Sequence, residues 1–123
     1  RIVNIASNAG LKGFPYVSAY CAAKHGVVGL TRALALEVAD RRVTVNAVCP
    51  GFTDTDMLRE SIRNIAAKTG RTEAEARADL ARANRDGRII QPAEVAEAVA
   101  RLCAPTAGGT NGEAITIDAM EAA

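Results

Sequence analysis

The chain has few aromatic side chains and no tryptophan: Phe, Tyr and Trp together make up 3% of its 123 residues. Its core must therefore be aliphatic, built from the Val, Leu, Ile and Ala that supply most of the 49% of apolar residues. No apolar run approaches the roughly 20 residues that span a bilayer, and no signal-peptide pattern is visible. We therefore expect a soluble globular protein without a membrane partner.

An excess of either charge is also missing. Fifteen Lys and Arg balance fourteen Asp and Glu, which leaves a net charge of +1 and no reason to expect a nucleic-acid partner. The three cysteines, Cys21, Cys49 and Cys103, are an odd number without the spacing of metal ligands. We expect no metal site, and reduced thiols that pack as small hydrophobic side chains in a cytoplasmic protein.

What the sequence does contain is a set of groups suited to proton transfer. Tyr20 and Lys24 stand four residues apart in a helical pattern, which places them on one helix face. A nearby cation lowers the pKa of a tyrosine from its usual value of about 10, and Ser7, upstream, can donate a hydrogen bond. Taken alone, such a Tyr–Lys pair is usually structural, and a serine after a strand is usually a cap or turn residue. The combination favours a catalytic site.

Three motifs in order resemble the C-terminal half of the short-chain dehydrogenases/reductases. They are Arg1-Ile2-Val3-Asn4-Ile5-Ala6-Ser7-Asn8-Ala9-Gly10, Tyr20-x-x-x-Lys24 and Val45-Asn46-Ala47-Val48-Cys49-Pro50-Gly51. In that family a serine thirteen positions before the tyrosine orients the substrate carbonyl, and Ser7 has this offset. The resemblance implies that Tyr20 is the general acid/base and also contacts the cofactor, and that Lys24 lowers the pKa of Tyr20 and binds the nicotinamide ribose.

The same resemblance implies further contacts with an NAD or NADP cofactor. Pro50, Gly51 and the turn after them would lie against the nicotinamide. Thr53 would contact the carboxamide through its backbone, where the family usually has Ile or Val, and Thr55 would bind that group through its hydroxyl. The Gly-x-Gly-x-x-Gly turn and the family's catalytic asparagine on an upstream helix are absent from these residues. The acidic or basic residue that reads the adenosine ribose is absent too, and because that residue decides between NAD and NADP, the choice is open. The family commonly ends its last strand with Asp-Gly-Gly, where this chain has Asp118-Ala119-Met120.

The pattern of elements predicts an α/β fold with three parallel strands and flanking helices. By resemblance, residues 1–123 form a single partial domain, the C-terminal part of a Rossmann-type doubly wound sheet, in which residues 54–91 are a helical substrate lid. Within that segment Thr72 and Glu75 fit a capping box, and Ser18 fits an N-cap before the first helix. The expected strands are 1–7, 43–49 and 114–117, and the expected helices are 19–39, 54–67, 72–84 and 93–103, with Pro92 in the first turn of the last.

Charged residues are numerous in the expected lid but balanced in sign. Residues 54–91 hold eight Lys and Arg against seven Asp and Glu. We expect a mixed solvated face there. A cluster that grips the phosphates of a coenzyme A thioester is the alternative.

Two functions of different class are compatible with the sequence. The first is an oxidoreductase that moves a hydride between a nicotinamide and a carbonyl or secondary alcohol. Residues 18–29 and 48–52 look most like the acetoacetyl-CoA reductases, 3-hydroxybutyrate dehydrogenases and polyketide ketoreductases, which suggests a 3-oxo/3-hydroxyacyl thioester as substrate. The family also suggests a homo-oligomer formed through helix 19–39 and the C-terminal strand. The alternative is a catalytically silent truncated fragment that acts at most as an association module. The chain opens inside a strand, and because the family's cofactor-binding half is absent from these residues, we expect the chain to be inactive by itself.

Overall fold

The computed structural model describes residues 1–118 and has a three-stranded parallel sheet at its centre. The strands β1 (Ile2–Ile5), β2 (Val45–Pro50) and β3 (Ala114–Ile117) lie in the order β1-β2-β3. Ile2 is opposite Val45 in the first pair of strands, and Ala47 is opposite Ala114 in the second. The predicted three parallel strands are confirmed. The departure at Ala119-Met120 lies outside the described residues.

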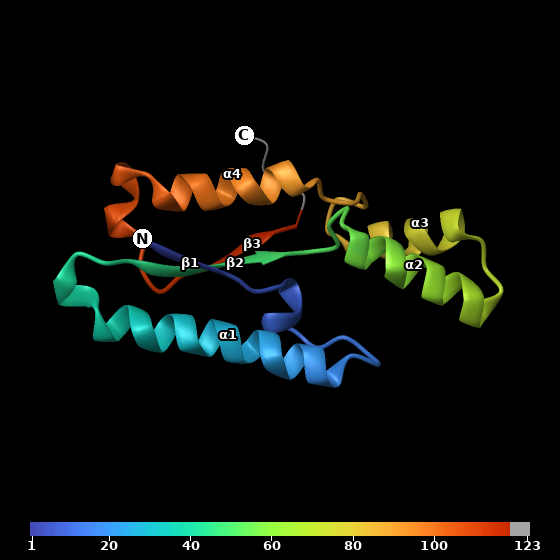
Figure 1. The fold of residues 1–123 in the computed structure, drawn as a ribbon, viewed down its shortest axis with the longest axis horizontal. Coiled ribbons are helices and arrows are strands. Elements are labelled where there is room, and N and C mark those ends of the chain that lie inside the picture. Colours follow the sequence, from blue (N-terminus) through green and yellow to red (C-terminus); the bar gives the residue numbers. More distant parts are fainter. Residues whose placement is uncertain (119–123) are drawn as a thin grey trace.

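Helices cover both faces of the sheet (Figure 1). Helix α1 (Ser18–Glu37) lies on one face and helix α4 (Pro92–Cys103) on the other, and together they enclose the central strand β2. The core is aliphatic, as the composition predicts: Ala6, Val28, Ala47 and Cys49 form one buried cluster. The α/β fold class is therefore confirmed, with the sheet as the middle of three layers.

A second helical unit projects beyond the carboxyl ends of the strands (Figure 1). Helices α2 (Asp56–Thr69) and α3 (Glu73–Ala83) lie beyond the carboxyl end of β2 and pack on a separate cluster of Leu58, Ile62, Ala76 and Ile89. The remaining elements are short 3-10 helices: η1 (Asn8–Gly10), η2 (Ala39–Arg41) and η3 (Pro105–Gly109). Because parallel strands end at the same edge, the segments after β1 and β2 lie on the side of the α2–α3 pair.

The helix ends predicted from local sequence patterns are confirmed in most places, and one predicted cap is wrong. The capping box of Thr72 and Glu75 is present at the start of α3, and Gly70, with φ 72°, ends α2 in the left-handed region. The prediction of Ser18 as an N-cap was wrong. The amide of Cys21 already donates to the Val17 carbonyl at 2.9 Å, so Ser18 lies inside the helix and Val17 occupies the cap without a side-chain bond.

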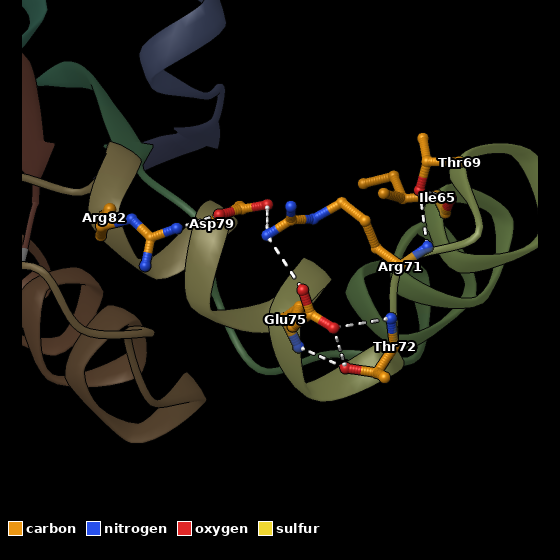
Figure 2. A network of polar contacts seen from close by, with 7 residues as sticks. All are labelled: Ile65, Thr69, Arg71, Thr72, Glu75, Asp79 and Arg82. Carbon is orange, nitrogen blue, oxygen red and sulfur yellow. Dashed lines mark hydrogen bonds and ion pairs between the residues drawn. The ribbon is translucent and has the colours of Figure 1, made fainter.

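The charges of the α2–α3 pair are largely bonded to one another. Figure 2 shows Arg71 reaching both Glu75 and Asp79, with Arg82 on the other side of Asp79. Near the start of α2, Arg59 and Arg77 both approach the carboxylate of Asp54, at 3.2 and 3.4 Å. These pairings favour the mixed solvated face over a cluster held ready for phosphate groups.

Two apolar surfaces of the described residues remain exposed. Helix α1 buries Cys21, Val28, Thr31 and Ala35, whereas Leu36 on its outer side is 81% exposed. Strand β1 lies at an edge of the sheet, and Ile5 is 49% exposed. Among the helices of residues 1–118, none is long and apolar enough to cross a membrane.

Candidate active site

Ser7 lies just after β1, at the carboxyl edge of the sheet. It is buried, and it caps η1: its Oγ accepts a hydrogen bond from the Ala9 amide at 3.1 Å and donates to Oδ1 of Asn8 at 3.3 Å. The capping role that serines commonly play after strands is therefore present here. It uses the acceptor side of the hydroxyl, and the donated bond is long, so the hydroxyl hydrogen can turn to another acceptor.

Tyr20 and Lys24 occupy the first two turns of α1, and Lys24 is bonded to the end of β1. The Nζ atom of Lys24 donates a hydrogen bond to the Ile5 carbonyl at 3.2 Å. The same Nζ lies 5.7 Å from the centroid of the Tyr20 ring, within the range of a cation–π contact. The ammonium group thus lies between the strand end and the phenol, while the Tyr20 side chain remains 38% exposed. A phenol that is open to a substrate and next to a fixed cation is suited to proton transfer.

Gly10 brings these two segments together, and the sequence pattern did not reveal this role. A Cβ atom at Gly10 would lie 2.7 Å from the Lys24 carbonyl oxygen and 3.0 Å from the Lys24 carbonyl carbon. Only a glycine therefore allows η1 to pack directly on the α1 backbone at Lys24. In the sequence, Gly10 is one of several loop glycines, and nothing local distinguishes it from Gly13, which has open space around it.

A second group of predicted residues follows β2. The Gly51 amide donates to the Ile117 carbonyl at 2.8 Å, and Thr53 pairs with Ile90 in a single parallel bridge. Thr53 Oγ1 donates to the Gly51 carbonyl at 3.0 Å. Thr55 caps α2: its Oγ1 accepts from the Leu58 amide at 3.3 Å and donates to the Thr53 carbonyl at 3.3 Å. The turn that follows Pro50 is therefore held by backbone bonds on both sides.

The structure brings the two groups to the same edge of the sheet without joining them directly. Within residues 1–118, no hydrogen bond connects Ser7 to Tyr20, and none connects either of them to the turn after Pro50. Cys49 lies between the groups, on the strand next to Ser7. Burial raises the pKa of the Cys49 thiol, and a bond from the Ser7 backbone together with the charges of Arg32 and Lys24 only partly opposes this. Cys49 therefore stays protonated and acts in packing.

The remaining titratable candidates do not extend the site. His25 Nδ1 contacts the Cys21 carbonyl at 2.8 Å, a local contact one helical turn back. Cys21 is buried but Cys103 is exposed, so Cys103 is not the packing residue that the composition suggested. No group of three His, Cys, Asp or Glu among residues 1–118 could hold a metal ion. Two shallow hollows, of about 420 and 300 Å³, lie on the α2–α3 pair, and neither includes a predicted site residue.

Comparison with known proteins identifies relatives along nearly the whole chain. Residues 1–119 match the family model described as enoyl-(acyl carrier protein) reductase. A putative ketoacyl reductase of Streptomyces coelicolor is 45% identical over 118 residues, which are 95% of this chain and 45% of the relative. A D-beta-hydroxybutyrate dehydrogenase of Rhizobium meliloti is 51% identical over 75 residues, which are 61% of this chain and 29% of the relative.

The fold is also found among solved structures. A variant of the actinorhodin polyketide ketoreductase, solved with NADPH, superimposes with a TM-score of 0.89 at 42% identity. The match covers 95% of this chain and 45% of that one. It confirms the predicted fold class, the C-terminal part of a Rossmann-type parallel sheet. The chain spans less than half the length of these relatives.

Proposed function

Because the chain belongs to the short-chain dehydrogenase/reductase family, we propose that it carries the proton-transfer site of an NAD(P)-dependent oxidoreductase. The enzyme would move a hydride between a nicotinamide and a carbonyl or secondary alcohol. The observation that carries the proposal is the position of Lys24, whose Nζ is anchored on the Ile5 carbonyl 5.7 Å from the Tyr20 ring centroid. This bond holds the ammonium group near the Tyr20 ring, where it can stabilise a phenolate.

Tyr20 transfers the proton. In reduction its phenol gives a proton to the substrate carbonyl oxygen, and the ammonium of Lys24 stabilises the phenolate that remains. In oxidation the phenolate takes the proton from the alcohol. Ser7 holds the same oxygen: its hydroxyl hydrogen turns from Asn8 Oδ1 to the substrate, while its oxygen still accepts from the Ala9 amide. Ser7 thus caps η1 and orients the substrate at once.

The donors at this edge suit a nicotinamide cofactor, which supplies or accepts the hydride when it is bound. The Lys24 ammonium has three N–H donors and uses one on the Ile5 carbonyl, so two can reach ribose hydroxyls. The turn of Pro50 and Gly51 provides the surface for the ring, with Thr53 and Thr55 at its far end. Thr55 donates only a long bond of 3.3 Å, so its hydroxyl can turn to a carboxamide. NADPH, NADP and NADH are each named for a structural relative, and both NAD and NADP remain candidates here.

We also propose a 3-oxo/3-hydroxyacyl thioester as the substrate, a class supported by the names of the ketoacyl reductase and hydroxybutyrate dehydrogenase relatives. Residues 54–91, which include α2 and α3, would form the substrate lid, since they stand beyond the strand end that carries Gly51. The exposed face of α1 around Leu36, with β3, supports a homo-oligomer. The free cysteines support a reducing compartment such as the cytoplasm.

The test replaces Tyr20 by phenylalanine in the full-length protein. We expect Tyr20→Phe to lower kcat by about 10²- to 10⁴-fold, the usual contribution of general acid–base catalysis, because the proton donor is lost and the ring is kept. The dissociation constant of the nicotinamide cofactor, measured by fluorescence titration, should change little. Tyr16→Phe, the same change at a fully exposed position, is the matched control. An unchanged kcat for Tyr20→Phe would contradict the proposal.

A further inference from the structure

Asn84 is the most completely bonded polar side chain near the turn after β2. It follows the last residue of α3 and is only 2% exposed. Its Oδ1 accepts from the Phe52 amide at 2.8 Å, and its Nδ2 donates to the carbonyls of Phe52 and Arg88 at 2.9 and 2.8 Å. Both N–H donors and the amide oxygen are therefore used, and all three bonds go to backbone groups.

The two bonds between the Asn84 side chain and the Phe52 backbone resemble those that a residue of a neighbouring strand would make. The amide of Asn84 contacts both the N–H and the C=O of Phe52, as a paired strand residue does. The Phe52 carbonyl also accepts from the Ile90 amide at 2.9 Å. Asn84 and Ile90, which both follow α3 in the chain, therefore hold Phe52 in place after the end of β2.

Gly51 leaves room for the side-chain amide of Asn84 because it has no Cβ atom. A Cβ atom at Gly51 would overlap Oδ1 of Asn84 and would lie 3.2 Å from both Cγ of Asn84 and Oδ1 of Asp118. Asp118 in turn accepts from the Arg85 amide at 2.9 Å, which fixes the backbone next to Asn84. The absence of a side chain at Gly51 thus serves the close approach of Asn84 from a segment 33 residues further along the chain.

We propose that Asn84 is a positioning residue for the nicotinamide cofactor. It holds Gly51 and Phe52 in the conformation that the cofactor meets, and it ties that turn to the α2–α3 pair. This inference rests on the proposed function, because it assumes that the turn after Pro50 lies against the nicotinamide. It goes further by assigning cofactor affinity to a buried side chain that does not itself touch the cofactor.

The test is Asn84→Asp in the full-length protein, a change that keeps the size of the side chain. The new carboxylate turns an oxygen, in place of the N–H donors, toward the carbonyls of Phe52 and Arg88. An unsatisfied buried group disfavours the conformation of the turn that the cofactor meets, so we expect the cofactor dissociation constant at neutral pH to rise by about ten- to a hundredfold. The value of kcat at saturating cofactor should fall far less, since Tyr20, Lys24 and Ser7 are unchanged.

A pH titration separates this role from a merely structural one. The charged groups next to position 84 are Arg85, Arg88, whose guanidinium is paired with Asp86 and Glu94, and the carboxylate of Asp118 beside Gly51. Burial and the Asp118 carboxylate raise the pKa of a carboxyl group placed there, and its protonated form has one donor and one acceptor, enough to restore the pair with Phe52. The cofactor affinity of Asn84→Asp should therefore recover as the pH falls. Ala100→Asp, which adds a carboxylate at an exposed position on α4 outside the proposed lid, is the control for the added negative charge, and it should bind the cofactor normally at every pH.

Each outcome has a defined meaning. Normal cofactor affinity in folded Asn84→Asp at neutral pH, or a loss that does not recover with acid, overturns the inference. If Asn84→Asp does not fold, Asn84→Ser removes the same pairing without burying a charge, and it should still weaken binding about tenfold; unchanged binding then overturns the inference. If Tyr20→Phe retains full turnover, the proposed function fails. If Tyr20→Phe is inactive while Asn84→Asp binds normally, only the role of Asn84 fails.

Discussion

The orientation of the Lys24 side chain depends on the folded structure as well as on the spacing of Lys24 from Tyr20 in the sequence. The interval from Tyr20 to Lys24 places both side chains on one helix face, but that spacing is common and does not orient the ammonium group. The orientation comes from the Ile5 carbonyl, which accepts from Nζ at 3.2 Å. The next residue, Ala6, still pairs with Val48 through its amide, so the ladder continues past Ile5. Because alternate residues of a strand turn their backbone groups to opposite sides, the Ile5 carbonyl lies on the outer side of the edge strand β1, where a side chain from α1 can bind it.

The charge of Lys24 is predicted to serve both the proton donor and the cofactor. In Lys24→Met the stem of the side chain remains, but the bond to the Ile5 carbonyl and the cation near Tyr20 are lost. We expect kcat to fall and the cofactor dissociation constant to rise by about tenfold or more, since hydrogen bonds from a charged group are among the stronger ones. Steady-state kinetics and fluorescence titration on the full-length protein measure the two effects. Arg41→Met, which removes a positive charge at an exposed position in η2, should alter neither. Wild-type values of both quantities for Lys24→Met would refute the double role.

At the scale of single elements, short-range signals predict most helix ends because the bonds that form them are local. The capping box at Thr72 involves a residue three positions away, and Pro92 opens α4 as expected of a residue without an N–H. Ser18 fails as a cap because a cap residue must stand outside the helix, and the conformation at Tyr16 and Val17 starts the helix one residue early. That conformation depends on the preceding loop, which no local pattern describes.

The start of α4 is predicted to carry an acid-sensitive part of the stability. Two bonds from the Arg88 guanidinium, and then one from the Gln91 amide, lower the pKa of the Glu94 carboxyl to about 2. Since this is below the value of about 4.3 in an unfolded chain, the contribution is complete above that pH and is lost as the pH falls toward 2. Glu94→Gln should therefore lower Tm at neutral pH, and the difference from wild type should shrink in acid.

Thermal unfolding of the full-length protein between pH 7 and about pH 2 checks this. The effect should be small, because both partners are partly exposed and solvent screens the pair. Glu97→Gln removes a pair with Arg101 on the exposed side of the same helix and should change Tm less. If the Tm difference between wild type and Glu94→Gln grows as the pH falls, its pH dependence has the wrong sign, and this explanation is excluded.

At the scale of the whole molecule, the proposed function assigns the described residues to one side of a cofactor site. The strand ends carry Ser7 and Gly51, α1 carries Tyr20 and Lys24, and α2 and α3 stand beyond them (Figure 1). The edge strand β1 keeps its outer side unpaired within residues 1–118. The sequence contains no Gly-x-Gly-x-x-Gly turn for the cofactor phosphates.

Cofactor binding by the isolated chain distinguishes the two candidate functions, an oxidoreductase and a catalytically silent fragment. We expect the 123-residue chain by itself to produce no enhancement of NADH or NADPH fluorescence, because the phosphate-binding turn supplies much of the affinity. The full-length protein should show the enhancement under the same conditions. Micromolar binding by the isolated chain would exclude the silent-fragment alternative, and no binding by the full-length protein would contradict the enzyme.

The sequence by itself determined the order and type of the elements, the family, and the intervals among Ser7, Tyr20 and Lys24. It could do so because periodicity, caps and motif spacing are properties of neighbouring residues. Only the tertiary structure decided that Lys24 binds the end of β1, that Gly10 admits the α1 backbone, and that Asn84 holds the turn at Gly51. These contacts join residues that are far apart along the chain, and their energies depend on burial and close approach, which exist only once the layers have packed.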